Sequence, residues 1–364
     1  MFRVYILKLG IVGLPGSGKT TVFRALTGGV EIHDEKGRRE IGLGVVKVTD
    51  PRLDFLAEYH KPRKTTPVTV QYSDIHGFGE DQPKGAGASL EKFMAMVRPL
   101  DAFVHCVRLF DSPLQGPAEP LRDFKALEEE MILSDLGVVE RRLDRVSRDI
   151  QRGKKELSKE RDLLTKALEV LEQGKPLRCL GADDDLESLR GFSFLSIKPE
   201  LVLLNVGENQ AKRTVEEVMD QISSHTAGQP KVELDWLYAD IEAEIAGMPL
   251  EDAKEFLQDL ALQEGAKERI IRTSFRLLNL IVFFTAGEPE VRAWPLRNGA
   301  TALQAAGTVH SDMAKGFIRA EVISYDDFRA AGSMAAAHKA GKVRLEGRDY
   351  IVRDGDIMLF RFNI

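Results

Sequence analysis

The sequence predicts an α/β fold: a mostly parallel β-sheet covered by helices, an inserted antiparallel helical hairpin and a small α+β module at the C-terminal end. Three observations predict it. A glycine-rich loop stands between an apolar run and a helix-like run near the start of the chain. Further apolar runs alternate with helical patterns, as in parallel sheets. About 90 residues with a coiled-coil spacing separate two of these runs, far more than a parallel crossover needs.

The glycine-rich loop comes first in the chain. Residues 10–21 read GIVGLPGSGKTT, which contains the pattern G-x-x-x-x-G-K-[ST] between an apolar run at Leu7 to Val12 and a helical run at Thr21 to Leu26. Glycines let consecutive backbone N–H groups surround a phosphate, Lys19 supplies a cation, and Thr20 offers a hydroxyl to Mg²⁺. The residues predicted to bind the nucleotide here are Gly13, Pro15, Gly16, Ser17, Gly18, Lys19, Thr20 and Thr21.

The later apolar runs are expected to be strands of one sheet, with the nucleotide at their carboxyl ends. These runs are Gly44 to Val48, Val68 to Ile75, Ala102 to Phe110, Leu201 to Val206 and Val232 to Ala239. In YSDIHG, Asp74 lies near the end of the second of these runs and is predicted to hold the metal, while the N–H of Gly77 can contact the γ-phosphate. Phe78 stands where Ras-like GTPases carry a water-orienting Gln, and His76 is a candidate to replace that Gln.

The segment LLNVGENQ places Asn205, Val206 and Glu208 where GTPases carry the base-reading motif N-K-x-D. Glu208 is one methylene longer than Asp, so the paired hydrogen bonds to guanine should weaken, whereas an amide such as Asn205 can pair with adenine. Ala239, at the end of the next apolar run, is also assigned to the nucleotide site. These residues alone leave ATP and GTP both open.

A helical hairpin is expected between the runs that end at Phe110 and begin at Leu201. Apolar residues recur at alternating steps of four and three; this pattern stops at Gly153 and then resumes. Arg161 falls on the seam, which is the side of the second helix expected to face the first. The apolar positions are Ile132, Leu136, Val139, Leu143, Val146, Ile150, Leu157, Leu164, Leu168 and Leu171. A structural helix pair and a docking arm both fit this pattern.

The pattern of predicted secondary structure changes again from about Asn279. Two strands and a helix are expected first, and the end of the chain reads as short strands joined by EGRD and RDGD turns. We therefore predict a nucleotide-binding domain over residues 1–118 and 181–278, the hairpin over 119–180 and an α+β domain over 279–364. Trp294 and most Phe residues are expected in cores.

Composition limits the remaining choices. The chain has 364 residues, of which 43% are hydrophobic and 30% charged, so it can bury a sizeable core. A formal net charge of −6 means that nucleic-acid contacts would need a local basic patch, and sequence reading of DNA is not expected. Cys106 and Cys179 lack metal or disulfide spacing. Neither a secretion signal nor a membrane-length apolar run is found, which favours a cytoplasmic protein without membrane contact.

The chain resembles the YchF or Obg-like ATPase family over nearly its whole length. The resemblance is carried by segments such as GIVGLPGSGKTTVFRALTGG, DIHGF, HCVRLFD, NVGE, FFTAGEPEVRAW and GRDYIVRDGDIMLFRF. It implies a preference for ATP carried by Asn205, Val206 and Glu208, and a hydrophobic residue, here Phe78, in place of the catalytic Gln. It also implies a C-terminal ubiquitin-like TGS domain and association with ribosomes and translation-linked stress responses.

The sequence departs from this family in three places. The loop reads GLPGSGKTT where the family usually has Asn-Val before GKS, and the segment EIHDEKGRREIGL, where switch I would lie, contains no Thr. The loop DSPLQGPAEP is short and lacks the histidine proposed to catalyse hydrolysis in the family, while His105 reads as a structural residue in a strand. We therefore expect slow hydrolysis, with Lys19 and Mg²⁺ providing most of the transition-state stabilisation.

Three classes of function are consistent with these motifs. A slow ATPase switch docked on ribosomes through the hairpin and the C-terminal domain is favoured over a nucleotide-gated scaffold and over a small-molecule kinase. The oligomeric state stays open, with a monomer as the simplest expectation. A basic face for ribosomal RNA and an ordinary solvated surface are both compatible with the C-terminal basic residues Lys315, Arg319, Arg344, Arg348 and Arg353.

Overall fold

A computed structural model describes residues 7–28, 41–75, 93–181, 188–249, 252–253 and 265–363. The chain divides into two compact units. The phosphate-loop unit contains Lys8–Gly44 and Gln71–Thr273, and the C-terminal unit contains Val45–Val70 and Ser274–Ile364. Within the described ranges, no helix is both long enough and apolar enough to cross a lipid bilayer.

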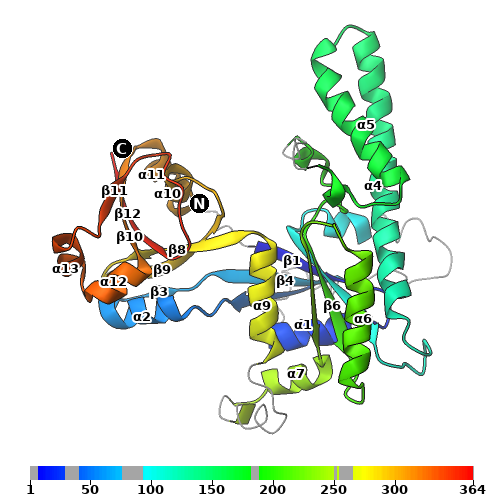
Figure 1. Ribbon diagram of the computed structural model, residues 1–364, viewed down its shortest axis with the longest axis horizontal. Helices are drawn as coiled ribbons and strands as arrows, with labels where there is room; N and C mark the ends of the chain where they lie inside the picture. The colour runs from blue at the N-terminus through cyan, green and yellow to red at the C-terminus, as the bar shows by residue number, and fades with distance from the viewer. Residues whose placement is uncertain are drawn as a thin grey trace. The chain divides into compact units, whose positions relative to one another are not determined.

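The phosphate-loop unit is built on a six-stranded sheet with the order β2-β4-β1-β5-β6-β7 (Figure 1). The strands are β1 (Leu7–Val12), β2 (Ile41–Lys47), β4 (Thr69–Ile75), β5 (Ala102–Leu109), β6 (Glu200–Val206) and β7 (Val232–Leu237). The pairings of β1 with β5, β5 with β6 and β6 with β7 are all parallel. Every residue of β5 and β6 is buried, because parallel strands are covered on both faces. The predicted parallel sheet is confirmed.

Helices cover both faces of this sheet. On one face α1 (Lys19–Thr27) packs against α7 (Ala239–Ala246), and α9 (Ala266–Leu277) follows in the chain. On the other face α6 (Lys212–His225) covers β5 and β6 through a hydrophobic cluster that also contains Phe124. The carboxyl ends of the parallel strands are left for the loops that follow them, which is where ligands bind in such sheets.

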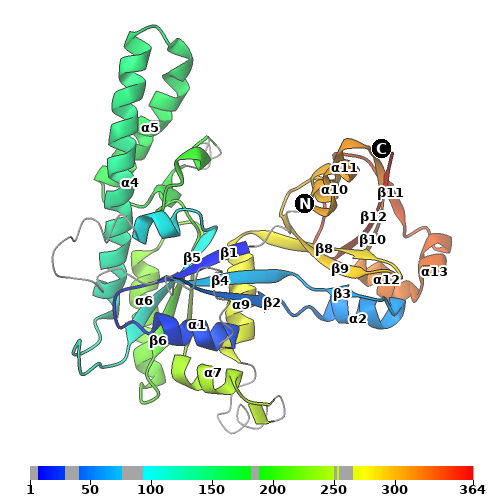
Figure 2. The same cartoon turned by 180° about the vertical axis from the view of Figure 1, so that it is seen from behind.

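The inserted segment forms the predicted antiparallel hairpin, which Figure 1 and Figure 2 show from opposite sides. It consists of α4 (Pro120–Gln151), a 3₁₀ turn η1 (Lys155–Leu157) and α5 (Ser158–Glu172). Arg142 on α4 donates to the Glu160 carboxylate on α5 at 2.6 Å. The seam is a hydrophobic cluster that contains Ile132, Val139, Val146, Leu164, Ala167 and Leu171.

The predicted seam position of Arg161 is wrong. Its side chain is exposed and pairs with the neighbouring Asp162 at 2.7 Å. The buried positions of α5 are instead Leu164, Ala167 and Leu171. The 3₁₀ turn has three residues per turn and comes directly before α5. The spacing of the buried positions in α4 therefore does not predict which positions of α5 are buried.

Two buried ionic groups attach the hairpin and the strands to one another. The carboxylate of Asp135 on α4 accepts hydrogen bonds from the backbone N–H groups of Leu195 and Ser196 at 2.8 to 3.0 Å. His105 Nδ1 lies 2.7 Å from a Glu200 carboxylate oxygen, and the Arg178 guanidinium contacts the other oxygen. Burial opposes a charge on Glu200, but Arg178 and His105 outweigh it and hold the pKa of Glu200 at about 2. The interpretation of His105 as structural is confirmed.

The C-terminal unit has its own mixed sheet, in the order β11-β10-β12-β8-β9-β3. Its strands are β3 (Thr65–Thr66), β8 (Leu280–Ala286), β9 (Val291–Arg297), β10 (Phe317–Ser324), β11 (Arg344–Glu346) and β12 (Asp356–Phe362). Its helices are α2 (Pro51–His60), α10 (Ala302–Val309), α11 (Ser311–Lys315), α12 (Tyr325–Ala331) and α13 (Met334–Lys339). The predicted α+β module is confirmed, while its ubiquitin-like TGS character stays a prediction.

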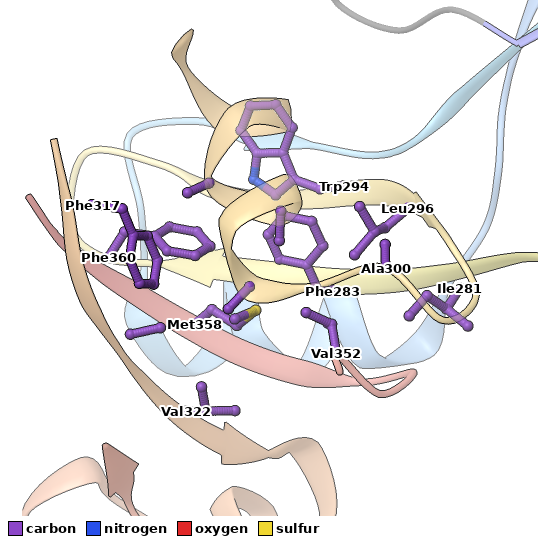
Figure 3. Packing of buried hydrophobic residues seen from close by; sticks show 14 residues of the cluster. Ile281, Phe283, Trp294, Leu296, Ala300, Phe317, Val322, Val352, Met358 and Phe360 are labelled. Atoms are coloured by element: carbon purple, nitrogen blue, oxygen red, sulfur yellow. The ribbon is translucent and has the colours of Figure 1, made fainter. Parts of the chain in front are cut away.

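The core of the C-terminal unit lies between this sheet and α10. Figure 3 shows Phe283, Trp294, Met358 and Phe360 packed together there. Trp294 is 8% exposed, and its indole N–H donates to the Thr285 hydroxyl at 2.9 Å, so the ring is buried with its polar atom satisfied. The expectation that Trp294 fills a core is confirmed.

The grouping of residues 45–70 differs from the predicted boundaries, which placed residues 1–118 in the nucleotide-binding domain. β3 pairs in parallel with β9, and Arg63 N–H donates to the Glu288 carbonyl at 3.1 Å. Arg52 on α2 forms an ion pair with Asp354 at 2.6 Å. A two-residue strand carries no periodicity, so its distant partner cannot be recognised from local sequence.

Candidate phosphate-binding site

The loop between β1 and α1 has a backbone that glycine makes possible. Gly16 and Gly18 have φ angles of 72° and 86°, in the left-handed region that other residues rarely adopt. Ser17 N–H donates to the Leu14 carbonyl at 3.2 Å, which closes a tight turn. The first N–H groups of an α-helix lack partners within the helix, and α1 begins at Lys19, directly after this turn. This arrangement suits a phosphate.

Two side chains from neighbouring strands hold the loop from the sheet side. The Cys106 thiol on β5 donates to the Ser17 carbonyl at 3.1 Å, and Asn205 Nδ2 on β6 donates to the same oxygen at 3.0 Å. In a trans peptide the carbonyl and the following N–H point in opposite directions. With the Ser17 carbonyl held toward the sheet, the Gly18 N–H is turned away from it, toward the space a phosphate would occupy.

Asn205 also connects the loop to α7. Its Oδ1 atom accepts a hydrogen bond from the Ala239 N–H at 3.4 Å, at the start of that helix. Asn205 is 3% exposed, so its amide is used inside the protein. The structure therefore brings together Ser17, Asn205 and Ala239, three of the residues predicted for the nucleotide.

The close approach of Asn205 requires glycine at position 18. A Cβ atom on Gly18 would lie 2.1 Å from Asn205 Nδ2, and one on Gly13 would lie 2.4 Å from the Cys106 carbonyl oxygen. Both distances are far below a van der Waals contact. The two ends of the loop therefore lie in direct contact with β5 and β6.

The predicted cation and metal ligands lie at the other side of the loop. Lys19 is 5% exposed, and its ammonium donates to the Leu14 carbonyl at 3.0 Å across the loop. The Thr20 hydroxyl donates to Asp74 Oδ2 at 2.8 Å, and Asp74 is a buried residue of β4. A hydroxyl and a carboxylate oxygen are hard ligands that fit Mg²⁺, which takes few protein ligands and completes its shell with water and phosphate. The described residues contain no cluster of three or more His, Cys, Asp and Glu able to hold a metal ion.

The other residues predicted for the base lie in different surroundings. Val206 points to the opposite face of β6 from Asn205, where it packs in the cluster with Val215 and Val218. Glu208 is exposed just beyond the strand. Gly207 N–H donates to the Leu109 carbonyl at 3.1 Å, which fixes the start of this loop against the end of β5. Pro15 and Thr21 are half-buried beside the phosphate loop.

Several predicted site residues lie outside the described residues. These are His76, Gly77 and Phe78, together with residues 31–40 of the segment without Thr. Their roles stay predictions.

Two neighbours of the loop were not predicted from the sequence. The Cys106 thiol is buried, and burial raises its pKa to about 12, so it is a protonated hydrogen-bond donor. Arg108, also on β5, is 4% exposed. An arginine inside an otherwise apolar strand pattern is a detectable signal, because a buried guanidinium must find acceptors.

A glycine loop at the carboxyl end of β1, a buried lysine and a paired Thr20 and Asp74 define a P-loop nucleotide-binding protein. Comparison with known proteins agrees with this class. The family model YchF-GTPase_C, described as a protein of unknown function (DUF933), matches residues 280–363.

Full-length relatives assign the family. The chain is 42% identical to the ribosome-binding ATPase YchF of Haemophilus ducreyi, over 98% of this chain and 99% of that protein. It is 33% identical to Obg-like ATPase 1 of Gallus gallus, over 98% of this chain and 92% of that protein. The solved YchF GTPase of Schizosaccharomyces pombe covers 98% of this chain and 97% of its own, with a TM-score of 0.82 and 30% identity. The chain belongs to the YchF and Obg-like ATPase family of nucleotide hydrolases, as the sequence predicts.

Gly18→Ala tests the close contact between the loop and Asn205. The new Cβ would displace Asn205, so the affinity for Mg-triphosphate should fall at least about tenfold, as measured by isothermal titration calorimetry. Gly228→Ala is the matched control, since Gly228 has a φ of 81° but no atom within 4 Å of the new Cβ. Equal affinities for the two variants would contradict the close contact described above.

Proposed function

We propose that the protein binds ATP with Mg²⁺ at the loop formed by residues 13–20 and hydrolyses it slowly as a molecular switch. The observation that carries the proposal is the loop held by Asn205 and Cys106, with Lys19, Thr20 and Asp74 on its other side. The names of the relatives support nucleotide hydrolysis but divide between ATPase and GTPase. A GTP-preferring enzyme is the alternative.

Each group of the site has a role in this proposal. The backbone N–H groups of the loop and the Lys19 ammonium bind the phosphate oxygens and stabilise the charge that develops on them. Thr20 and Asp74 would hold Mg²⁺, which when bound neutralises phosphate charge. Gly77 is proposed to contact the γ-phosphate through its N–H, with His76 as a candidate beside it. Phe78 cannot orient water by hydrogen bonding, so we expect slow turnover.

The preference for adenine is proposed to depend on the segment after β6. The exposed Glu208 side chain is longer than the Asp of guanine-reading proteins, and a site that loses paired hydrogen bonds discriminates poorly for guanine. Val206, with its apolar side chain packed below the segment, supplies no cationic stem to cover the base. Asn205 contributes by placing the loop and the Ala239 N–H.

Competition between ATP and GTP for the Mg²⁺-loaded protein tests this proposal. We expect the wild-type protein to prefer ATP, and Glu208→Asp to shift the ratio of the two dissociation constants toward GTP by about tenfold. Lys19→Ala should weaken both nucleotides together, because it removes a contact to the phosphates. A clear preference of the wild-type protein for GTP would establish the alternative.

We also propose that this switch works as a monomer on ribosomes in the cytoplasm. The ribosome is proposed as the partner because the bacterial relatives are named ribosome-binding ATPases. At the tip of the hairpin, Arg152, Lys154 and Lys155 are exposed, although Lys154 also pairs with Asp149 at 3.2 Å. On the C-terminal unit, Arg344 is paired with Glu346 and Lys315 with Asp312, which reduces the charge available for RNA. The tip is therefore the favoured phosphate contact.

Co-sedimentation with ribosomes at increasing KCl concentration tests the contact. Replacing Arg152, Lys154 and Lys155 together by Gln should weaken binding and lower the salt slope by up to about three, roughly one per lost phosphate contact. Replacing Lys315, Arg319 and Arg348 by Gln is the comparison on the C-terminal unit and should have a smaller effect. A wild-type protein that does not sediment with ribosomes at low salt would refute the proposal.

A further inference from the structure

A tight turn formed by residues 111–117 follows β5. Ser112 N–H donates to the Gly116 carbonyl at 3.0 Å, and Gly116 N–H donates back to the Ser112 carbonyl at 2.7 Å. Gln115 N–H also donates to the Ser112 carbonyl, at 3.3 Å, and Gly116 adopts a φ of 71°. These bonds give the turn a defined conformation, so its side chains have defined directions.

The buried guanidinium of Arg108 fixes this turn to the sheet. It donates to the carbonyls of Phe110, Gly116 and Pro117 at 3.1, 2.8 and 3.0 Å. Three charge-assisted hydrogen bonds from one rigid planar group hold both ends of the turn. Arg108 is thus a positioning residue for whatever the turn presents.

The turn presents Gln115 to the phosphate loop. A Cβ atom built on Gly16 would lie 2.3 Å from Gln115 Nε2 and 2.8 Å from Oε1, so the carboxamide lies directly against Gly16. Gln115 is itself exposed. The neighbouring Leu114 is 96% exposed. An exposed amide therefore lies at the edge of the phosphate loop.

A carboxamide beside the phosphate loop has the hydrogen-bonding groups that are needed to orient a water molecule for hydrolysis. It carries an acceptor and two donors in one plane, so it can accept a hydrogen bond from water and donate one to a phosphate oxygen. A neutral Gln performs this orientation in Ras-like enzymes. Phe78 cannot, because its ring has neither a conventional donor nor acceptor.

Building on the proposed function, we propose that Gln115 is a catalytic residue that orients the attacking water. The water oxygen forms a bond to the γ-phosphorus while the bond from that phosphorus to the β–γ bridging oxygen breaks. The bonding electron pair leaves with the diphosphate oxygen, and the water protons go to the phosphate product and to solvent. Gln115 stays neutral throughout: Oε1 accepts from the water, and Nε2 donates to an oxygen of the transferred group.

Single-turnover hydrolysis of Mg-ATP, with affinity for a non-hydrolysable ATP analogue measured in parallel, tests this role. Gln115→Met keeps the length of the side chain without its hydrogen bonds, and Gln115→Ala removes it. Both should hydrolyse at least about tenfold more slowly than wild type, while the affinity stays within about twofold. Leu114→Ala, one residue earlier on the same turn, should match the wild-type protein in both measurements.

Two results would overturn the role of Gln115: wild-type rates in both Gln115 variants, or a loss of rate that only follows a loss of affinity. Failure of the proposed function has a different signature, because the wild-type protein itself would then bind no nucleotide. A wild-type protein that binds ATP without hydrolysing it would overturn the catalytic role and leave the binding site in place.

Discussion

The hydrogen bonds that Cys106 and Asn205 donate to the Ser17 carbonyl are the constraint on which the site depends. They come from two adjacent parallel strands and converge on one oxygen, so the loop keeps one orientation relative to the sheet. Because that carbonyl points toward the sheet, the next N–H points away from it. Gly18 has to lack a side chain for Asn205 to reach this far. The glycine pattern of the loop is thereby explained by packing as well as by backbone conformation.

The order of the strands in the sheet determines from which direction each of the other side chains reaches the loop. β1 lies between β4 and β5, so Asp74 on β4 and the two donors on β5 and β6 approach the loop from different sides. Thr20 and Asp74, the proposed metal ligands, are therefore separate from the groups that hold the loop. Beyond the end of β5, Arg108 fixes a turn whose Gln115 lies against Gly16. The loop is thus contacted by strands β5 and β6 at the Ser17 carbonyl and by this turn at Gly16.

The sequence predicted most of the fold, because the phosphate loop, the apolar strands and the hairpin are local patterns with clear periods. It predicted Lys19, Thr20 and Asp74 together, since each follows or ends a recognisable strand. It did not predict that β3 joins the distant β9, or that Arg161 lies off the seam, because a two-residue strand and a 3₁₀ turn interrupt periodicity. Its base contact for Asn205 stays a prediction. It did not predict that the buried Asn205 amide holds the loop, or that Gln115 lies against Gly16. Such roles depend on contacts between residues far apart in the chain.

Calorimetric titration of the Asn205→Ala variant with Mg²⁺ complexes of ATP, GTP and inorganic tripolyphosphate tests the central constraint most directly. Since Asn205 acts through the Ser17 carbonyl, its loss should weaken all three ligands by a similar factor, about tenfold for one buried hydrogen bond, even though tripolyphosphate has no base. Unchanged affinity for tripolyphosphate together with weaker binding of ATP would contradict this account and would return Asn205 to the role of a base-reading residue.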